Sequence, residues 1–193
     1  MSLRRVVPVM ALFLAAAGCG TEAGQAVPAA SSSTPLSATG VPSLPPRPLA
    51  VPLDGVDPCA LLTAEQRVGF GLDLGPSRGM QPSEDNAATC DWLKKEAGGG
   101  VSFVPSMANG VGVWLDGSRG GEVTPVSVVG FPAVEVRDES LTPPYCAVAV
   151  DVADGQQLLV VNSPSRTQPA STDEQCASAV LYAEAAMQTL VAR

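Results

Sequence analysis

The chain has 193 residues, of which 46% are hydrophobic, 16% charged and 4% aromatic, a length that allows one ordinary domain plus an additional segment. It contains no histidine, which excludes Ser-His-Asp and Cys-His catalytic devices and every zinc site built on imidazole. Nineteen acidic against eleven basic residues give a net charge of −8, which argues against nucleic acid as a partner because that binding depends on cationic contacts to phosphates.

The first nineteen residues have the pattern of a secretory signal. Arg4 and Arg5 precede an uncharged apolar run over residues 6–16, which is too short to span a bilayer. The following Ala17-Gly18-Cys19 resembles the bacterial lipobox, in which the cysteine is acylated, by palmitate among other chains, and becomes the first residue. Ordinary cleavage after residues 15–17 is the alternative, and it would leave Cys19 as an unpaired thiol. We therefore expect residues 1–19 to be a lipoprotein signal peptide with its lipobox cysteine, lipidation at Cys19, and anchoring to the extracytoplasmic face of the cell membrane.

Residues 20–53 differ sharply in composition from the rest. They hold seven prolines and eight serines or threonines but only two charged residues, Glu22 and Arg47. Such a stretch buries too little apolar surface to offset the entropy of ordering it, so we predict a disordered Pro/Ser/Ala-rich tether. The remaining residues 54–193 are then the globular domain.

The domain begins with two helix signals. Asp57 can cap a helical turn that starts at Pro58, and Thr63 with Gln66 has the spacing of a capping box, which predicts a second short helix over Ala64–Phe70. Gly71 would end that helix.

Extended segments follow. Their period-two patterns predict strands near residues 89–94, 101–103, 126–128, 134–136, 145–152 and 157–162, with a further alternation at 111–115. Ala153-Asp154-Gly155 reads as the turn of a hairpin. Gly130-Phe131-Pro132 would interrupt the sheet and mark a bend or an edge.

The chain closes with a predicted helix. Ser171 and Glu174 stand at capping-box spacing, and apolar residues from Cys176 to Leu190 recur at steps of three and four. This stripe is best explained as packing against the sheet. The whole pattern favours an α+β fold, in which an N-terminal and a C-terminal helix cover an antiparallel sheet of about five strands.

Four cysteines remain after Cys19, and four allow three pairings. We favour Cys59 with Cys90 and Cys146 with Cys176, because each pair joins a helix to a strand predicted to lie beneath it. No Cys-x-x-Cys motif is present to support a redox role instead.

Three segments resemble one family. They are Asp57-Pro58-Cys59-Ala60-Leu61-Leu62-Thr63, then Cys90-Asp91-Trp92, then Val129-Gly130-Phe131-Pro132-Ala133. In this order, and after a lipobox and linker, they are similar to the actinobacterial lipoprotein family called domain of unknown function 3558, over about residues 55–192. The glycine-rich stretch 109–121 and the alanine at the start of the lipobox depart from that pattern. The resemblance implies location and fold, and it supplies no catalytic residues.

A search for chemistry among the residues finds no catalytic motif. Ser118 lacks both the Gly-x-Ser-x-Gly spacing and a histidine base. Adjacent acids such as Glu84-Asp85 stand where loops and caps usually carry them, and Asp154-Gly155 is explained by turn chemistry rather than by calcium. We therefore predict no enzymatic activity, no cofactor and no metal, although carboxylates alone could serve a hydrolase.

Four residues in or just before the glycine-rich stretch are the best candidates for an exposed partner patch: Met107, Val111, Trp114 and Leu115. The anchor, the long tether and the lack of a catalytic motif favour a non-catalytic binding or accessory module of the cell envelope. Its partner would be an envelope protein or a small apolar ligand, and we expect a monomer. The alternatives are a carrier of a lipid or other apolar small molecule, which would need an apolar cavity, and a carboxylate-dependent hydrolase, which would need two converging acids.

Overall fold

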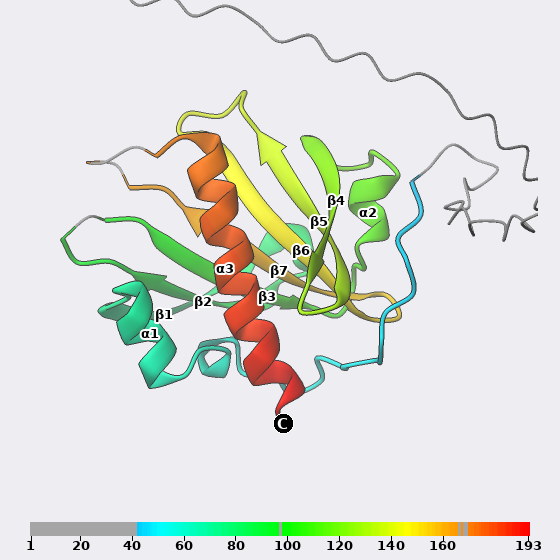
Figure 1. The fold of residues 1–193 in the computed structure, drawn as a ribbon, viewed down its shortest axis with the longest axis horizontal. Helices are drawn as coiled ribbons and strands as arrows, with labels where there is room; N and C mark the ends of the chain where they lie inside the picture. The colour runs from blue at the N-terminus through cyan, green and yellow to red at the C-terminus, as the bar shows by residue number, and fades with distance from the viewer. Residues whose placement is uncertain (1–41, 97, 166, 168–169) are drawn as a thin grey trace, which may run out of the picture. The chain divides into compact units, whose positions relative to one another are not determined.

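Seven antiparallel strands form a sheet in the computed structural model of the chain (Figure 1), in the order β1-β2-β3-β7-β6-β5-β4. The structure describes residues 42–193 except 97, 166 and 168–169. The predicted signal with Cys19, and the predicted tether as far as residue 41, lie outside the described residues. The described residues from 42 onward belong to one compact unit. The strands are β1 (Leu74–Gln81), β2 (Ala87–Leu93), β3 (Gly100–Ser106), β4 (Glu122–Val128), β5 (Phe131–Asp138), β6 (Tyr145–Ala153) and β7 (Gln156–Ser163).

The helices begin where the sequence places their caps. The 3-10 turn η1 (Pro58–Ala60) starts after Asp57, whose carboxylate accepts a hydrogen bond from the amide of Cys59. Helix α1 (Ala64–Phe70) has the complete capping box of Thr63 and Gln66 and ends at Gly71, whose φ of 68° requires the left-handed region that glycine tolerates. Helix α3 (Thr172–Val191) likewise has the capping box of Ser171 and Glu174. A second 3-10 turn, η2 (Pro82–Glu84), joins β1 to β2.

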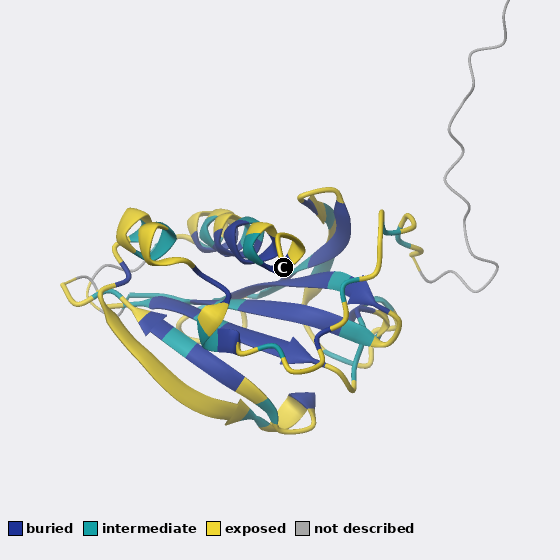
Figure 2. Ribbon diagram, turned by 90° about the horizontal axis from the view of Figure 1, so that it is seen from below, coloured by how far each residue is buried: buried dark blue, intermediate teal, exposed yellow. Residues whose placement is uncertain are grey.

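Both faces of the central strands are buried. Successive side chains of a strand point to opposite faces, so Val148 of β6 packs with Met187 of α3 in the larger cluster, whereas Ala149 packs with Trp114 in a second one. Helix α3 lies across β4 to β7 on the first face, and α1 lies on the same side (Figure 2). The short helix α2 (Gly112–Leu115) covers part of the second face.

The prediction of an antiparallel α+β domain with two disulfides is confirmed, and two details of it were wrong. The sheet has seven strands rather than about five. Six of them lie at the segments with a period-two pattern, and the seventh, β1, is an edge strand that is exposed along almost its whole length and therefore carries no alternating pattern. The segment 111–115 is not a strand. Val111 and Trp114, three residues apart, are instead brought to the same buried side by a helical turn.

Part of the segment predicted as tether packs on this domain. The amide of Val51 donates to the carbonyl of Val152 at 2.7 Å, and the amide of Leu53 donates to the side chain of Gln156 at 2.8 Å. Leu53 is 2% exposed and belongs to the larger core cluster. The packed part of the chain thus begins before residue 54.

Candidate binding site

The predicted partner patch is not a continuous exposed surface. Met107 is 55% exposed, but Val111 and Trp114 are each only 8% exposed, and Leu115 is partly buried against the second core cluster. The indole nitrogen of Trp114 donates to Oε1 of Gln157 at 2.9 Å. We had expected Trp114 to be exposed because glycines surround it. The helical turn buries it instead, and its indole proton finds an internal acceptor.

This hydrogen bond belongs to a buried polar network that no motif in the sequence predicts. The carboxylate of Glu84, a residue that is 1% exposed, pairs with the guanidinium of Arg119. It also accepts hydrogen bonds at 3.2 Å from the side-chain amides of Asn109 and Gln157. The Arg119 guanidinium lies 4.9 Å from the centre of the Trp114 ring. The network fastens η2 and the segment around α2 to β7, so we interpret it as structural.

Both predicted disulfides are present in the structure. Cys59 is bonded to Cys90 across 31 residues, and Cys146 is bonded to Cys176 across 30 residues. The first ties η1 to β2, and the second ties the start of α3 to β6. Each bond therefore fastens a helical segment to a strand, as the choice of pairing assumed.

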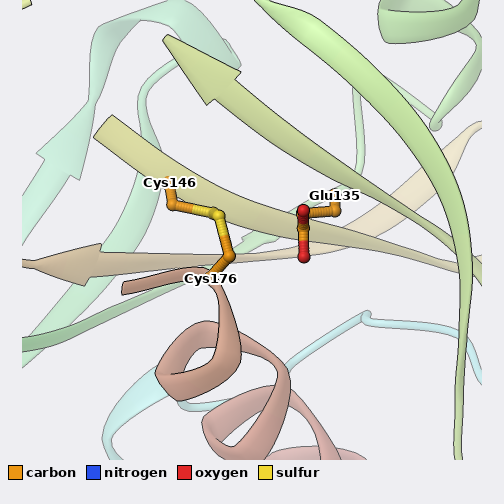
Figure 3. A group of neighbouring side chains, drawn as sticks. All are labelled: Glu135, Cys146 and Cys176. Carbon is orange, nitrogen blue, oxygen red and sulfur yellow. A yellow bond between two sulfur atoms is a disulfide. The ribbon is translucent and has the colours of Figure 1, made fainter. Parts of the chain in front are cut away.

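Glu135 lies beside the second disulfide (Figure 3), and its carboxylate and the two sulfur atoms lie within 4.8 Å of one another. The grouping has the residue types of a metal site. The sulfur atoms are bonded to each other and so do not offer the thiolates that a metal would need. The Glu135 carboxylate accepts a hydrogen bond at 2.7 Å from Arg137, which also pairs with Asp173. This cluster therefore links β5 to the start of α3.

Asp151 and Asp154, the acids near the β6–β7 turn, are joined by an arginine. Arg47 pairs with Asp151 at 2.7 Å and also with Asp154. Burial raises the pKa of Asp151, and the charge of Arg47 opposes that rise. The arrangement resembles a clamp for the segment before Val51 rather than a pair of acids that face a substrate.

A large hollow lies at one end of the sheet, where β6 begins and β7 ends. It has a volume of about 570 Å³, and its wall is mainly apolar. We call it the apolar groove and define it by Leu93, Leu141, Pro143, Pro144, Tyr145 and Val161. Leu141 is 50% exposed and Leu93 is 38% exposed. Burial, and secondly the negative charge of Glu84, raise the pKa of Tyr145 to about 12, so its phenol is neutral at physiological pH.

A second hollow, of about 230 Å³, lies at the same end of the sheet but on the face that α3 covers. Its wall is mostly polar. We call it the polar cleft and define it by Lys94, Asn162, Glu174, Gln175, Ser178 and Tyr182. The turn before β3 separates it from the apolar groove: a side chain at Gly99 would collide with backbone atoms of residues 163–165 at 2.7–3.0 Å, so only glycine allows this close approach.

Comparison with known proteins identifies a family without an assigned role. A family model described as "Protein of unknown function (DUF3558)" matches residues 14–189. No curated protein and no solved structure matches the chain. Among the helices of residues 42–193 that the structure describes, none combines the length and the apolar character needed to cross a membrane.

Proposed function

The chain belongs to the DUF3558 family, whose function is unknown, and we propose that it is a lipid-anchored, non-catalytic binding module of the extracytoplasmic cell envelope. The observation that carries the binding role is the apolar groove, because it leaves leucine, proline and tyrosine side chains in contact with water within one open hollow. When a ligand covers apolar side chains that lie together in this way, water is released from them and the free energy of the complex is lowered.

The extracytoplasmic location is supported by two independent features. The first is the signal-like segment that ends at Cys19. The second is the pair of disulfides in the domain, because such bonds persist in oxidising compartments outside the cytoplasm. Acylation of Cys19 and anchoring of the domain by that residue are part of the proposal.

The two alternatives fit the geometry less well. A carrier with a cavity between sheet and helix is disfavoured because core side chains, including Phe103 and Met187, fill that space. The apolar groove on the other face could still hold a small apolar molecule. A hydrolase would need two free acids in a cleft, and three acids with largely buried side chains, Glu84, Glu135 and Asp151, are each paired with an arginine.

Site-specific photo-crosslinking in cells would test the binding role. A photoreactive amino acid at Leu141 in the apolar groove should form covalent adducts with the partner. The matched control is Val68 on α1, an apolar residue that is 82% exposed but does not line the groove. Mass spectrometry of the adducts separates an envelope protein from a lipid or other small molecule. Equal adducts at both positions, or none at Leu141, would exclude the groove as the binding surface.

The anchor has its own test. The Cys19→Ser variant should leave the membrane fraction, whereas the mature natural chain should begin at Cys19 with the mass of its acyl chains. A mature chain that begins at Gly18 without acyl chains would refute the anchor and leave the binding role of the groove untouched.

A further inference from the structure

Three nearly buried polar side chains line the polar cleft, and one of them has a buried oxygen that accepts no hydrogen bond. Gln175 is 1% exposed, Tyr182 is 3% exposed and Asn162 is 8% exposed. The Gln175 amide nitrogen donates to the carbonyl of Ala170 at 3.1 Å, but its buried oxygen has no donor. Within the part of the chain that the structure describes, neither the Asn162 amide nor the Tyr182 hydroxyl makes a hydrogen bond. Since buried polar groups are nearly always paired, the unpaired oxygen of Gln175 at the wall of this hollow indicates a missing partner.

The charged groups of the cleft are of opposite sign. Among the described residues on its wall, Lys94 and Glu174 carry charge. Along residues 42–193, as far as they are described, Lys94 forms no ion pair. The Glu174 carboxylate accepts hydrogen bonds from the amide and hydroxyl of Ser171, and these bonds lower its pKa and keep it ionised. The cleft therefore presents a cation, an anion and a buried acceptor to the same small volume.

We propose that the polar cleft binds a small zwitterion, namely a free α-amino acid, with its carboxylate toward Lys94 and its ammonium group toward Glu174 and the Gln175 oxygen. An ammonium group carries three donors, which meets the need of an acceptor without a donor. The Asn162 amide and the Tyr182 hydroxyl can donate or accept, so they suit either end of the ligand. The volume of about 230 Å³ restricts the ligand to a small molecule. The site adjoins the apolar groove, with which it shares Asn162 and the turn at Gly98 and Gly99, but the proposal does not depend on the role of that groove.

Nuclear magnetic resonance of the purified full chain would test this site. The side-chain amide signals of Asn162 and Gln175 should shift and saturate as glycine is added. Acetate and methylammonium carry the two halves of the zwitterion, and each alone should bind at least about tenfold more weakly, because each leaves one charged partner unpaired. If glycine gives no saturable shift, or binds no better than its halves, the cleft holds water only and the proposal fails.

Matched variants separate binding from folding. Lys94→Met should weaken glycine binding by roughly tenfold or more, because it removes a charge-assisted hydrogen bond. The neighbouring Lys95→Met should have no effect, since Lys95 is exposed and does not line the cleft. Gln175→Met should abolish binding, because it removes the acceptor that has no donor in the free protein. It also removes the hydrogen bond to the carbonyl of Ala170, so the thermal midpoint should fall by no more than the loss of one hydrogen bond explains. Loss of binding in Lys95→Met, or full binding in Lys94→Met, would overturn the assignment.

Discussion

At the scale of single residues, the most demanding feature of the domain is the buried carboxylate of Glu84. A charge withdrawn from water costs several kcal/mol unless other groups compensate it. Here Arg119 supplies the opposite charge, and Asn109 and Gln157 supply hydrogen bonds. The network stabilises the folded domain only while every partner remains. A buried polar network with an unpaired member is less stable than an apolar core of the same shape.

Removal of Arg119 should therefore be costly. We expect Arg119→Met to lower the free energy of unfolding by about 3 kcal/mol, because the Glu84 charge is left buried and unpaired. Arg78→Met is the control: Arg78 pairs with Asp57, but the two side chains are 59% and 46% exposed, so its loss should cost far less than the loss of Arg119. Adding Glu84→Gln to Arg119→Met should recover part of the loss, because an amide carries no charge. Urea denaturation measures the free energy of unfolding of the two single variants and of the double variant. If Arg119→Met and Arg78→Met lower this free energy equally, the interpretation is contradicted.

Tyr145 provides a prediction on pH. Its pKa in the folded chain is about 12, above the ordinary value of 10.0. The folded state therefore holds the phenolic proton more tightly than the unfolded chain does. This contribution to stability is complete below pH 10 and is lost as the pH rises from 10 toward 12.

Ultraviolet titration of tyrosinate should show one phenol that ionises near pH 12 and is absent in Tyr145→Phe. Because the negative charge of Glu84 contributes to the raised pKa, Glu84→Gln should move the same transition to lower pH. A titration of Tyr145 near pH 10 would show that the residue is not buried as the structure has it.

At the scale of elements, the sequence predicted those features that depend on neighbours along the chain. The capping boxes at Thr63 and Ser171 are local hydrogen bonds, so their spacing alone identifies α1 and α3. The hairpin between β6 and β7 likewise follows from its alternation and its turn. Strand β1 could not be recognised, because its side chains face water on both sides and its place depends on pairing with β2. The alternation at 111–115 wrongly indicated a strand, because a segment of five residues fits both the two-residue period of a strand and the 3.6-residue period of a helix.

The two disulfides connect these elements, and they should not contribute equally. Each closes a loop of similar length, so the chain-entropy model assigns about 3.6 kcal/mol to each. Cys146 and Cys176 are both buried, at 0% and 1% exposure, whereas Cys59 is only partly buried. Replacement of Cys146 and Cys176 by alanine should therefore cost more than replacement of Cys59 and Cys90, because it also leaves cavities at two core positions. Calorimetric unfolding of the two double variants checks this order. The reverse order would show that the second bond is strained or weakly coupled to the core.

At the scale of the whole molecule, the candidate site lies where segments far apart in the sequence meet. The apolar groove is formed by residues near 93, 141–145 and 161, and the polar cleft adds residues of α3. None of these segments carries a motif, because each contributes only one to four side chains and the hollow exists only after the sheet has formed. The prediction of an exposed patch was wrong for a related reason. The exposure of Trp114 depends on the tertiary packing around α2, which the local sequence does not determine. Only the disulfide cysteines could be assigned in advance, because their pairing follows from the order of the elements.

The extent of the domain leads to the last prediction. Arg47 pairs with Asp151 and Asp154, and Leu53 is buried in the core. Proteinase K acting on the full chain should therefore leave a resistant core that begins no later than Arg47, since docked backbone resists cleavage. In Arg47→Met the start should move toward Val51, whose amide remains bonded to Val152. Arg78→Met breaks a different arginine–aspartate pair and should leave the start unchanged. Intact-mass analysis locates each start. A natural core that begins after Leu53 would mean that this segment does not stay docked in solution, and the boundary would then lie where composition alone placed it.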